Sequence, residues 1–181
     1  LKTSPVIAND GTDERLFSGC EGDYRFYSIR TKDGKGEKTA TTKEPECYFP
    51  SHPGLCEATS HIIVGSDEGE LYALKLDGLG EAWQWPDSAQ ERGTGLQFGA
   101  PAFNGNNIYI AQEGSTGADS LFLFQDVGLQ CNRVAAYGVR ASVVDAPIVD
   151  APGNVYFGTD SGYLVKIDAN LSSVIWRSKL L

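Results

Sequence analysis

Two groups of side chains in this sequence are of the types that bind metal ions. The only two histidines, His52 and His61, are nine residues apart, which is not the spacing of zinc ligands. Asp10, Asp13 and Glu14 form an acidic cluster, but calcium needs six to eight oxygens, normally from an alternating pattern with a distal acid. That pattern is missing here, so the sequence predicts an acidic surface turn and no metal site.

Hydroxyl and carboxyl side chains also adjoin in two places, Ser66-Asp67 and Thr159-Asp160. Both pairs lie between glycines, where Ser, Thr and Asp bond the nearby backbone of a turn. Gly93-Thr94-Gly95 does not precede a helical pattern, which argues against a phosphate-binding loop. We therefore predict no catalytic residue and no cofactor-binding residue.

Four cysteines are compatible with an oxidising compartment. Cys47 and Cys56 bracket a loop that contains two prolines and a glycine, and a disulfide between them would close that loop. Cys47–Cys56 is therefore a candidate disulfide. The pairing of Cys20 and Cys131 stays open.

The elements that must carry these residues are short apolar runs closed by turn residues, and they repeat. Runs rich in β-branched and aromatic residues end at Gly19, Gly65, Ala111 and Gly158, which are 46, 46 and 47 residues apart. A period in the 40s with room for four short strands is typical of β-propeller blades. The sequence thus predicts an all-β fold of about four four-stranded antiparallel blades.

Further landmarks share this register. A proline opens three of the units, and proline is tolerated at the start of a strand. The steps from Asp77 to Trp85 and from Asp168 to Trp176 are both eight residues, so we expect Trp85 and Trp176 to be equivalent and buried between units, with Trp83 less important. The expected blades are residues 1–34, 55–85, 100–137 and 145–176, with an insertion at 35–54.

These residues resemble the PQQ-like (quinoprotein alcohol dehydrogenase-like) β-propeller repeat, whose units carry a Gly-hairpin-Leu-Tyr-Ala-Leu strand and end in Asp, a short turn and Trp. The resemblance implies that Trp85 and Trp176 dock between neighbouring blades. It also implies a ring of six to eight blades, so the four present are expected to be part of a larger ring. Leu1 is not a translation start, which favours a piece of a longer protein. Open blade edges would then be available for self-association.

The charge and the distribution of apolar residues argue against some classes of function. A net charge of −9 argues against nucleic-acid binding, because phosphates require a basic surface. No apolar run reaches the length of a membrane span. The resemblance implies a periplasmic or extracellular location.

The family includes dehydrogenases that hold a quinone with an adjacent Cys-Cys pair and a calcium bound by Glu, Asn and Asp. No two cysteines are adjacent here. We therefore expect a non-catalytic protein-binding scaffold without a cofactor, similar to the outer-membrane-assembly lipoprotein of this family. The alternatives are an extracytoplasmic sensor domain of a membrane protein or kinase, and a fragment of a quinoprotein dehydrogenase.

Overall fold

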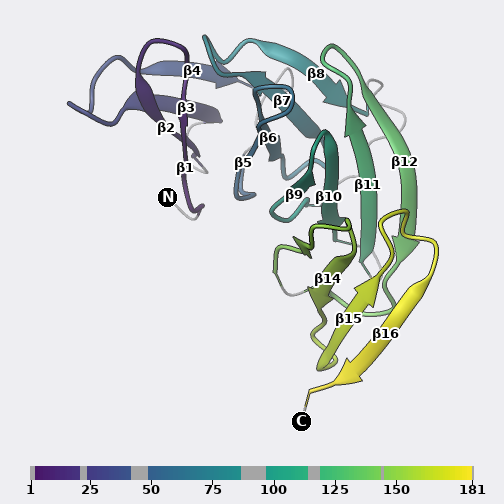
Figure 1. Ribbon diagram of the computed structural model, residues 1–181. Coiled ribbons are helices and arrows are strands. Elements are labelled where there is room, and N and C mark those ends of the chain that lie inside the picture. The colour runs from purple at the N-terminus through teal and green to yellow at the C-terminus, as the bar shows by residue number, and fades with distance from the viewer. Residues whose placement is uncertain are drawn as a thin grey trace.

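The computed structural model describes residues 3–20, 24–41, 49–86, 97–113, 119–143 and 145–180. These residues form four separate four-stranded antiparallel sheets, and no helix occurs in the described part of the chain. Each sheet is one blade, and the blades follow one another along an open arc (Figure 1). The predicted all-β fold of four blades is confirmed.

Each blade is a meander in which strands adjacent in sequence are adjacent in the sheet. Blade 1 contains β1 (Val6–Asn9), β2 (Glu14–Gly19), β3 (Arg25–Arg30) and β4 (Lys38–Thr41). Blade 2 contains β5 (Gly54–Cys56), β6 (His61–Gly65), β7 (Leu71–Lys75) and β8 (Glu81–Trp85). Blade 3 contains β9 (Ala102–Asn104), β10 (Asn107–Gln112), β11 (Ser120–Asp126) and β12 (Cys131–Gly138). Blade 4 contains β13 (Ile148–Val149), β14 (Val155–Gly158), β15 (Tyr163–Ile167) and β16 (Val174–Lys179).

The first strand of each blade lies on the concave side of the arc and the fourth strand on the convex side (Figure 1). In blades 2 and 3 the two middle strands are largely buried because both of their faces pack against neighbouring blades. In blades 2, 3 and 4 the pairing between the third and fourth strands shifts register at the same place, after Ala73, Leu123 and Lys166. Such a bulge increases the local twist of the outer strand.

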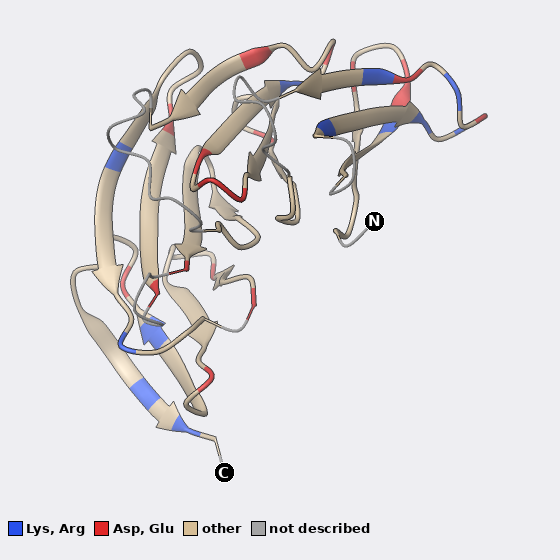
Figure 2. Cartoon of the chain, turned by 180° about the vertical axis from the view of Figure 1, so that it is seen from behind, with Lys and Arg blue, Asp and Glu red and all other residues tan. Residues whose placement is uncertain are grey.

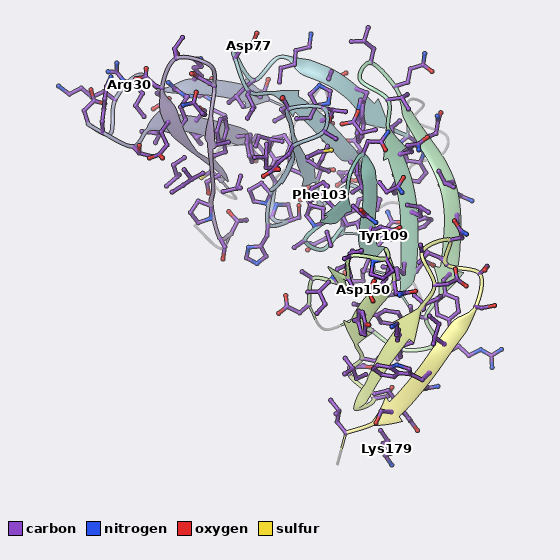
Figure 3. All side chains as sticks on the ribbon, viewed as in Figure 1. Arg30, Asp77, Phe103, Tyr109, Asp150 and Lys179 are labelled. Atoms are coloured by element: carbon purple, nitrogen blue, oxygen red, sulfur yellow. The ribbon has the colours of Figure 1, made fainter. Side chains whose placement is uncertain are left out.

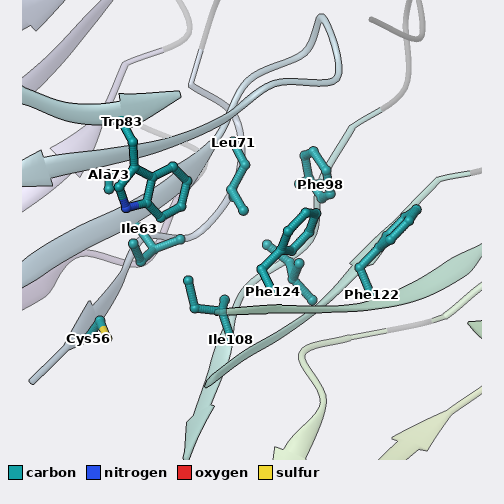
Figure 4. Packing of buried hydrophobic residues seen from close by; sticks show 10 residues of the cluster. Cys56, Ile63, Leu71, Ala73, Trp83, Phe98, Ile108, Phe122 and Phe124 are labelled. Carbon is teal, nitrogen blue, oxygen red and sulfur yellow. The ribbon is translucent and has the colours of Figure 1, made fainter. Parts of the chain in front are cut away.

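The hydrophobic core is divided into three clusters, one at each contact between successive blades. The middle cluster joins Ile63, Leu71 and Trp83 of blade 2 to Ile108 and Phe124 of blade 3 (Figure 4). Alternate residues of a strand point to opposite faces, so the middle strands of blades 2 and 3 each contribute to two of these clusters.

A short inlet segment leads into the first strand of each blade, and it ends in Pro5, Pro53, Pro101 or Pro147. The range 35–54 was expected to be an insertion, but it contains β4 and the Pro53 inlet of blade 2. Blade 1 therefore extends beyond residue 34. The sequence pattern does not predict β4, because its threonines are exposed and Ala40 is its single residue packed against the core.

The repeated glycine at the end of the second strand makes room for the next blade. A Cβ atom on Gly19 would lie 2.3 Å from the Phe49 carbonyl oxygen, and one on Gly65 would lie 2.5 Å from the Phe98 Cβ. Phe49 and Phe98 belong to the inlet segments of the following blades. At Gly158 an added Cβ would meet nothing within 4 Å, so no described residue packs beside this glycine.

The register expected for the fourth strand is wrong by two residues. Trp83 pairs with Ala73 of β7, and Trp176 pairs with the equivalent Lys166 of β15, whereas Trp85 pairs with Leu71. Trp83 and Trp176 are therefore equivalent. Trp83 is 5% exposed, Trp85 is half-buried against the middle core cluster, and Trp176 is 39% exposed.

The expected register is wrong because it aligns Asp77 with Asp168, and these two aspartates occupy different places in their hairpins. The hydrogen bond from the Lys75 N–H to the Gly80 carbonyl closes one hairpin, and the bond from the Asp168 N–H to the Ser173 carbonyl closes the other. Asp168 thus corresponds to Lys75, and Asp77 lies two residues further along.

Candidate binding surfaces

Trp83, which occupies the same position of the repeat as Trp176, docks between blades 2 and 3 against a buried carboxylate. Asp126, at the end of β11, is fully buried and accepts a hydrogen bond from the Trp83 indole nitrogen at 2.9 Å. Its other oxygen accepts from the Thr59 hydroxyl at 2.6 Å and lies 2.8 Å from the His61 Nδ1. The Gly128 N–H also donates to this carboxylate, at 3.0 Å. In this polar cluster several groups hydrogen-bond to one buried carboxylate, and the bonds from Thr59, His61 and Trp83 join blade 2 to blade 3.

This cluster has a structural role. A buried carboxylate is tolerated only when hydrogen bonds replace its water. The sequence did not reveal it because Asp126 is separated by 65 residues from His61, and neither lies in a recognisable motif. The one available signal was a single acidic residue at the end of a strand with four consecutive buried apolar residues.

The inlet segments of blades 2, 3 and 4 meet at a cleft of about 340 Å³, which we call the acidic cleft. It lies where β10 ends and β11 begins, between the segments that lead into β9 and β13. Its carboxylates belong to Glu113, Asp119 and Asp145, and His52 contributes an imidazole. In Figure 2 most acidic segments of blades 2 to 4 lie along the concave side of the arc, while β12 and β16 on the convex side carry basic residues.

The groups of the acidic cleft are held in place by the backbone. Asp119 is buried, and its carboxylate accepts the Val143 N–H at 2.6 Å, which ties the inlet of blade 4 to the start of β11. The His52 Nδ1 accepts the Ser4 N–H at 2.6 Å, so the remaining proton of a neutral ring is on Nε2. In a catalytic triad the histidine is oriented by a carboxylate, and His52 is oriented by a backbone amide instead. The cleft is suited to binding a cationic group.

One face of blade 4 packs against no other blade among the described residues, and we call it the blade-4 open face. It carries Tyr156, Leu164, Lys166 and Trp176. The rings of Tyr156 and Trp176 contact edge to face with centroids 5.9 Å apart, and the Lys166 ammonium lies 5.0 Å from the Tyr156 ring centre. The Tyr156 hydroxyl donates to Asp150, which is labelled in Figure 3, at 2.9 Å. This face therefore holds an ordered, partly exposed aromatic pair.

The corresponding surface at the other end of the arc is the blade-1 open face, formed by Ile7, Leu16, Tyr27 and Ile29. Ile7 is 55% exposed and the other three are half-buried. The opposite face of blade 1 packs against blade 2 through Phe17 and other residues. Both ends of the arc thus expose apolar side chains at positions of the repeat that are buried elsewhere in the chain.

The acidic turn of blade 1 binds lysines in the structure. The Asp10 carboxylate accepts from the Lys38 Nζ at 2.8 Å, and Asp13 accepts from the Lys32 Nζ at 2.7 Å. These bonds lower the pKa of both carboxyls. Within the described residues, no group of three or more His, Cys, Asp or Glu side chains is arranged to hold a metal ion.

Cys56 is a buried free thiol whose sulfur lies 3.7 Å from the Gly105 carbonyl oxygen. This differs from the predicted Cys47–Cys56 disulfide, and Cys47 itself lies outside the described residues. Cys20 and Cys131 are also free. Burial raises the pKa of Cys56 and raises that of Cys131 to about 12, so neither is a reactive thiolate at neutral pH.

No helix in the described part of the chain is long and apolar enough to cross a membrane. No known protein family and no curated protein matches the sequence. Solved structures do match. The quinohemoprotein alcohol dehydrogenase from Comamonas testosteroni superposes with a TM-score of 0.74 at 14% identity, covering 99% of this chain and 35% of that one.

BamB from Moraxella catarrhalis superposes with a TM-score of 0.63 at 13% identity over 99% of this chain, and the computationally designed Ika8 protein with a TM-score of 0.66 at 10% identity over 98%. This chain spans 53% of that BamB chain and 48% of the Ika8 chain. At such identities the likeness concerns the fold alone, and the chain is therefore a four-bladed arc of a β-propeller.

Proposed function

We propose that this chain is a non-catalytic part of a PQQ-like propeller that binds other proteins, and that the acidic cleft accepts a basic side chain of the partner. The observation that carries the proposal is the grouping of Glu113, Asp119 and Asp145 around one cleft of about 340 Å³. A periplasmic or extracellular location is part of the proposal and follows from the resemblance to the repeat.

Electrostatics supports a basic partner. The net charge of −9 attracts cationic surfaces over a distance, and a concave site lined by one sign of charge strengthens that attraction. Glu113 and Asp145 are exposed at the rim, whereas Asp119 is buried beneath them. An arginine or lysine entering the cleft would meet the two rim carboxylates first.

A peptide array measures this preference. We expect the 181-residue protein to retain peptides that contain arginine or lysine, and to retain them less as salt rises. Substitution Glu113→Gln together with Asp145→Asn should weaken this binding. The matched control is Glu57→Gln, an exposed acid in the turn between β5 and β6 that is outside the cleft.

Two results would count against the proposal. Retention of the same peptides by the doubly substituted cleft variant would place binding elsewhere. A stoichiometric quinone chromophore in the purified protein would favour the dehydrogenase alternative.

A further inference from the structure

We propose that a pocket between blades 3 and 4 binds an aromatic carboxylate. The pocket has a volume of about 380 Å³, which is within the range of small-molecule sites, and we call it the basic pocket. Residues 137–141, where β12 ends, form one side of it, and β15 and β16 contribute to the other. It shares no lining residue with the acidic cleft, so this inference goes beyond the proposed function and does not depend on it.

The basic pocket has an apolar interior and a cationic entrance. Val139 and Val165 are 5% and 4% exposed and form its floor. Arg140 and Arg177 are exposed and stand at its mouth. None of the described residues that line it is acidic. This arrangement fits a ligand with an apolar body and an anionic end.

The two arginines have no anionic partner in the part of the chain that the structure describes. No carboxylate there lies within ion-pair distance of Arg140 or Arg177. The Arg177 guanidinium lies over the Tyr163 ring, 3.5 Å from its centre, which holds it in place. The neighbouring carboxylate of Asp160 accepts the Ser142 N–H at 3.2 Å. Guanidinium groups bind carboxylates through parallel hydrogen bonds, so a carboxylate suits both arginines.

Tyr137 adds a further polar group to the basic pocket. Its ring lies 6.4 Å from the Phe157 ring, centre to centre, at the contact between blades 3 and 4. Its hydroxyl makes no hydrogen bond to another described residue, and the side chain lines the pocket. This hydroxyl can therefore donate to a carboxylate held by the arginines.

The preceding contact of the repeat shows what normally fills this space. Between blades 2 and 3 the corresponding region holds the rings of Trp85, Phe98, Phe122 and Phe124, three of which are seen in Figure 4. Neighbouring ring centres in this group are 4.9–6.3 Å apart. That contact is thus packed with aromatic side chains of the protein itself.

The contact between blades 3 and 4 has smaller residues at the same positions. The strand pairings place Val165 where blade 3 has Phe122. They also place Tyr137 where blade 2 has Trp85. Replacement of a ring by a valine leaves space between the blades, and the basic pocket occupies this space. An aromatic ligand would supply the ring that the preceding contact takes from the protein.

Titration calorimetry with phenylacetate measures the binding. We expect a Kd below about 1 mM for this acid, and binding at least about tenfold weaker for the neutral phenylacetamide, which lacks the charge. Inorganic phosphate, which has a charge and no ring, should also bind at least about tenfold more weakly. Absence of phenylacetate binding at about 1 mM, or equal binding of phosphate, would overturn the proposal.

Substitutions in the 181-residue protein test where the acid binds. Arg140→Gln and Arg177→Gln should each weaken phenylacetate binding by about tenfold, because each removes a cationic donor. Val165→Phe keeps both arginines and inserts the ring that blade 3 has at this position, so it should abolish binding. The matched control is Arg133→Gln, which removes the same charge from β12 at a site against Phe122, and it should bind as the wild type does.

Circular dichroism and the thermal midpoint establish that each variant is folded. Unchanged binding by Val165→Phe would show that the acid binds elsewhere. An equal loss in Arg133→Gln would show that only the net charge matters. Should Val165→Phe fail to fold, the two exposed arginines decide the question, and unchanged binding by both of their variants contradicts the proposal.

The aromatic carboxylate could be a free small acid or the last residue of a partner's chain. A tetrapeptide that ends in phenylalanine with a free carboxylate distinguishes these two sources. Binding at least about tenfold tighter than that of phenylacetate assigns the pocket to a chain end, and equal or weaker binding assigns it to a small acid. Both results require the same arginines and therefore support the basic pocket.

Discussion

Trp83 and Trp176 occupy one position of the repeat in two different environments. Trp83 lies between blades with its indole nitrogen on the buried Asp126 carboxylate, whereas Trp176 lies on an uncovered face against Tyr156. The contribution of a side chain here is set by the presence of the next blade and not by the residue type. The same holds for Gly65, which is crowded by Phe98, and Gly158, which is not.

We expect Trp83→Ala to lower the free energy of unfolding by about 3–5 kcal/mol, because it empties a packed site and removes one hydrogen bond to a buried carboxylate. Trp176→Ala should cost less than about 1 kcal/mol, since it removes mainly one aromatic contact. Denaturant unfolding of the two variants and the wild type measures both. Equal losses at the two positions would contradict the assignment.

Substitution of the two glycines gives a matched comparison. Gly65→Ala should destabilise the protein by roughly 1–3 kcal/mol, because its Cβ would overlap Phe98. Gly158→Ala should change stability by no more than about 0.5 kcal/mol, since nothing lies within 4 Å. Thermal unfolding of the two variants decides the point, and a large loss at Gly158 would mean that this end is covered in solution.

At the scale of elements, the strands were predictable and their exact pairing was not. The second strands could be located because glycine and apolar residues recur with a fixed period and close packing of the next blade requires that glycine. The fourth strands could not be aligned, because Asp77 and Asp168 lie at different places in two hairpins of similar composition. β4 carries almost no apolar signal, and the Asp126 cluster joins segments that are distant in sequence.

The hairpin turns predict how stability depends on pH. Hydrogen bonds from Lys38 lower the pKa of Asp10, and bonds from Asn154 and from Ser172 lower those of Asp150 and Asp168. A carboxyl whose pKa is lowered in the folded state stabilises the fold above its unfolded pKa of about 3.9, and this contribution is lost as pH falls through the folded value. We therefore expect the unfolding midpoint to fall as pH drops below about 4.

Chemical denaturation between neutral pH and pH 2 measures this dependence. The variant Asp10→Asn should show a shallower loss than the wild type, because one of the titrating carboxyls is gone. A midpoint that stays constant through this range would show that the turns do not keep these bonds in solution.

At the scale of the whole molecule, the chain is an arc with an acidic concave side and two apolar ends. The acidic cleft lies among the inlet segments on this concave side, where a basic partner would approach it in our proposed function.

The division of the core into three clusters has a consequence for how the protein comes apart. Each blade touches only its neighbours along the chain, so loss of a terminal blade removes one cluster and leaves the other two intact. Amide hydrogens should therefore exchange in a graded order, first in the end blades and last in the β6, β7, β10 and β11 strands beside the middle cluster.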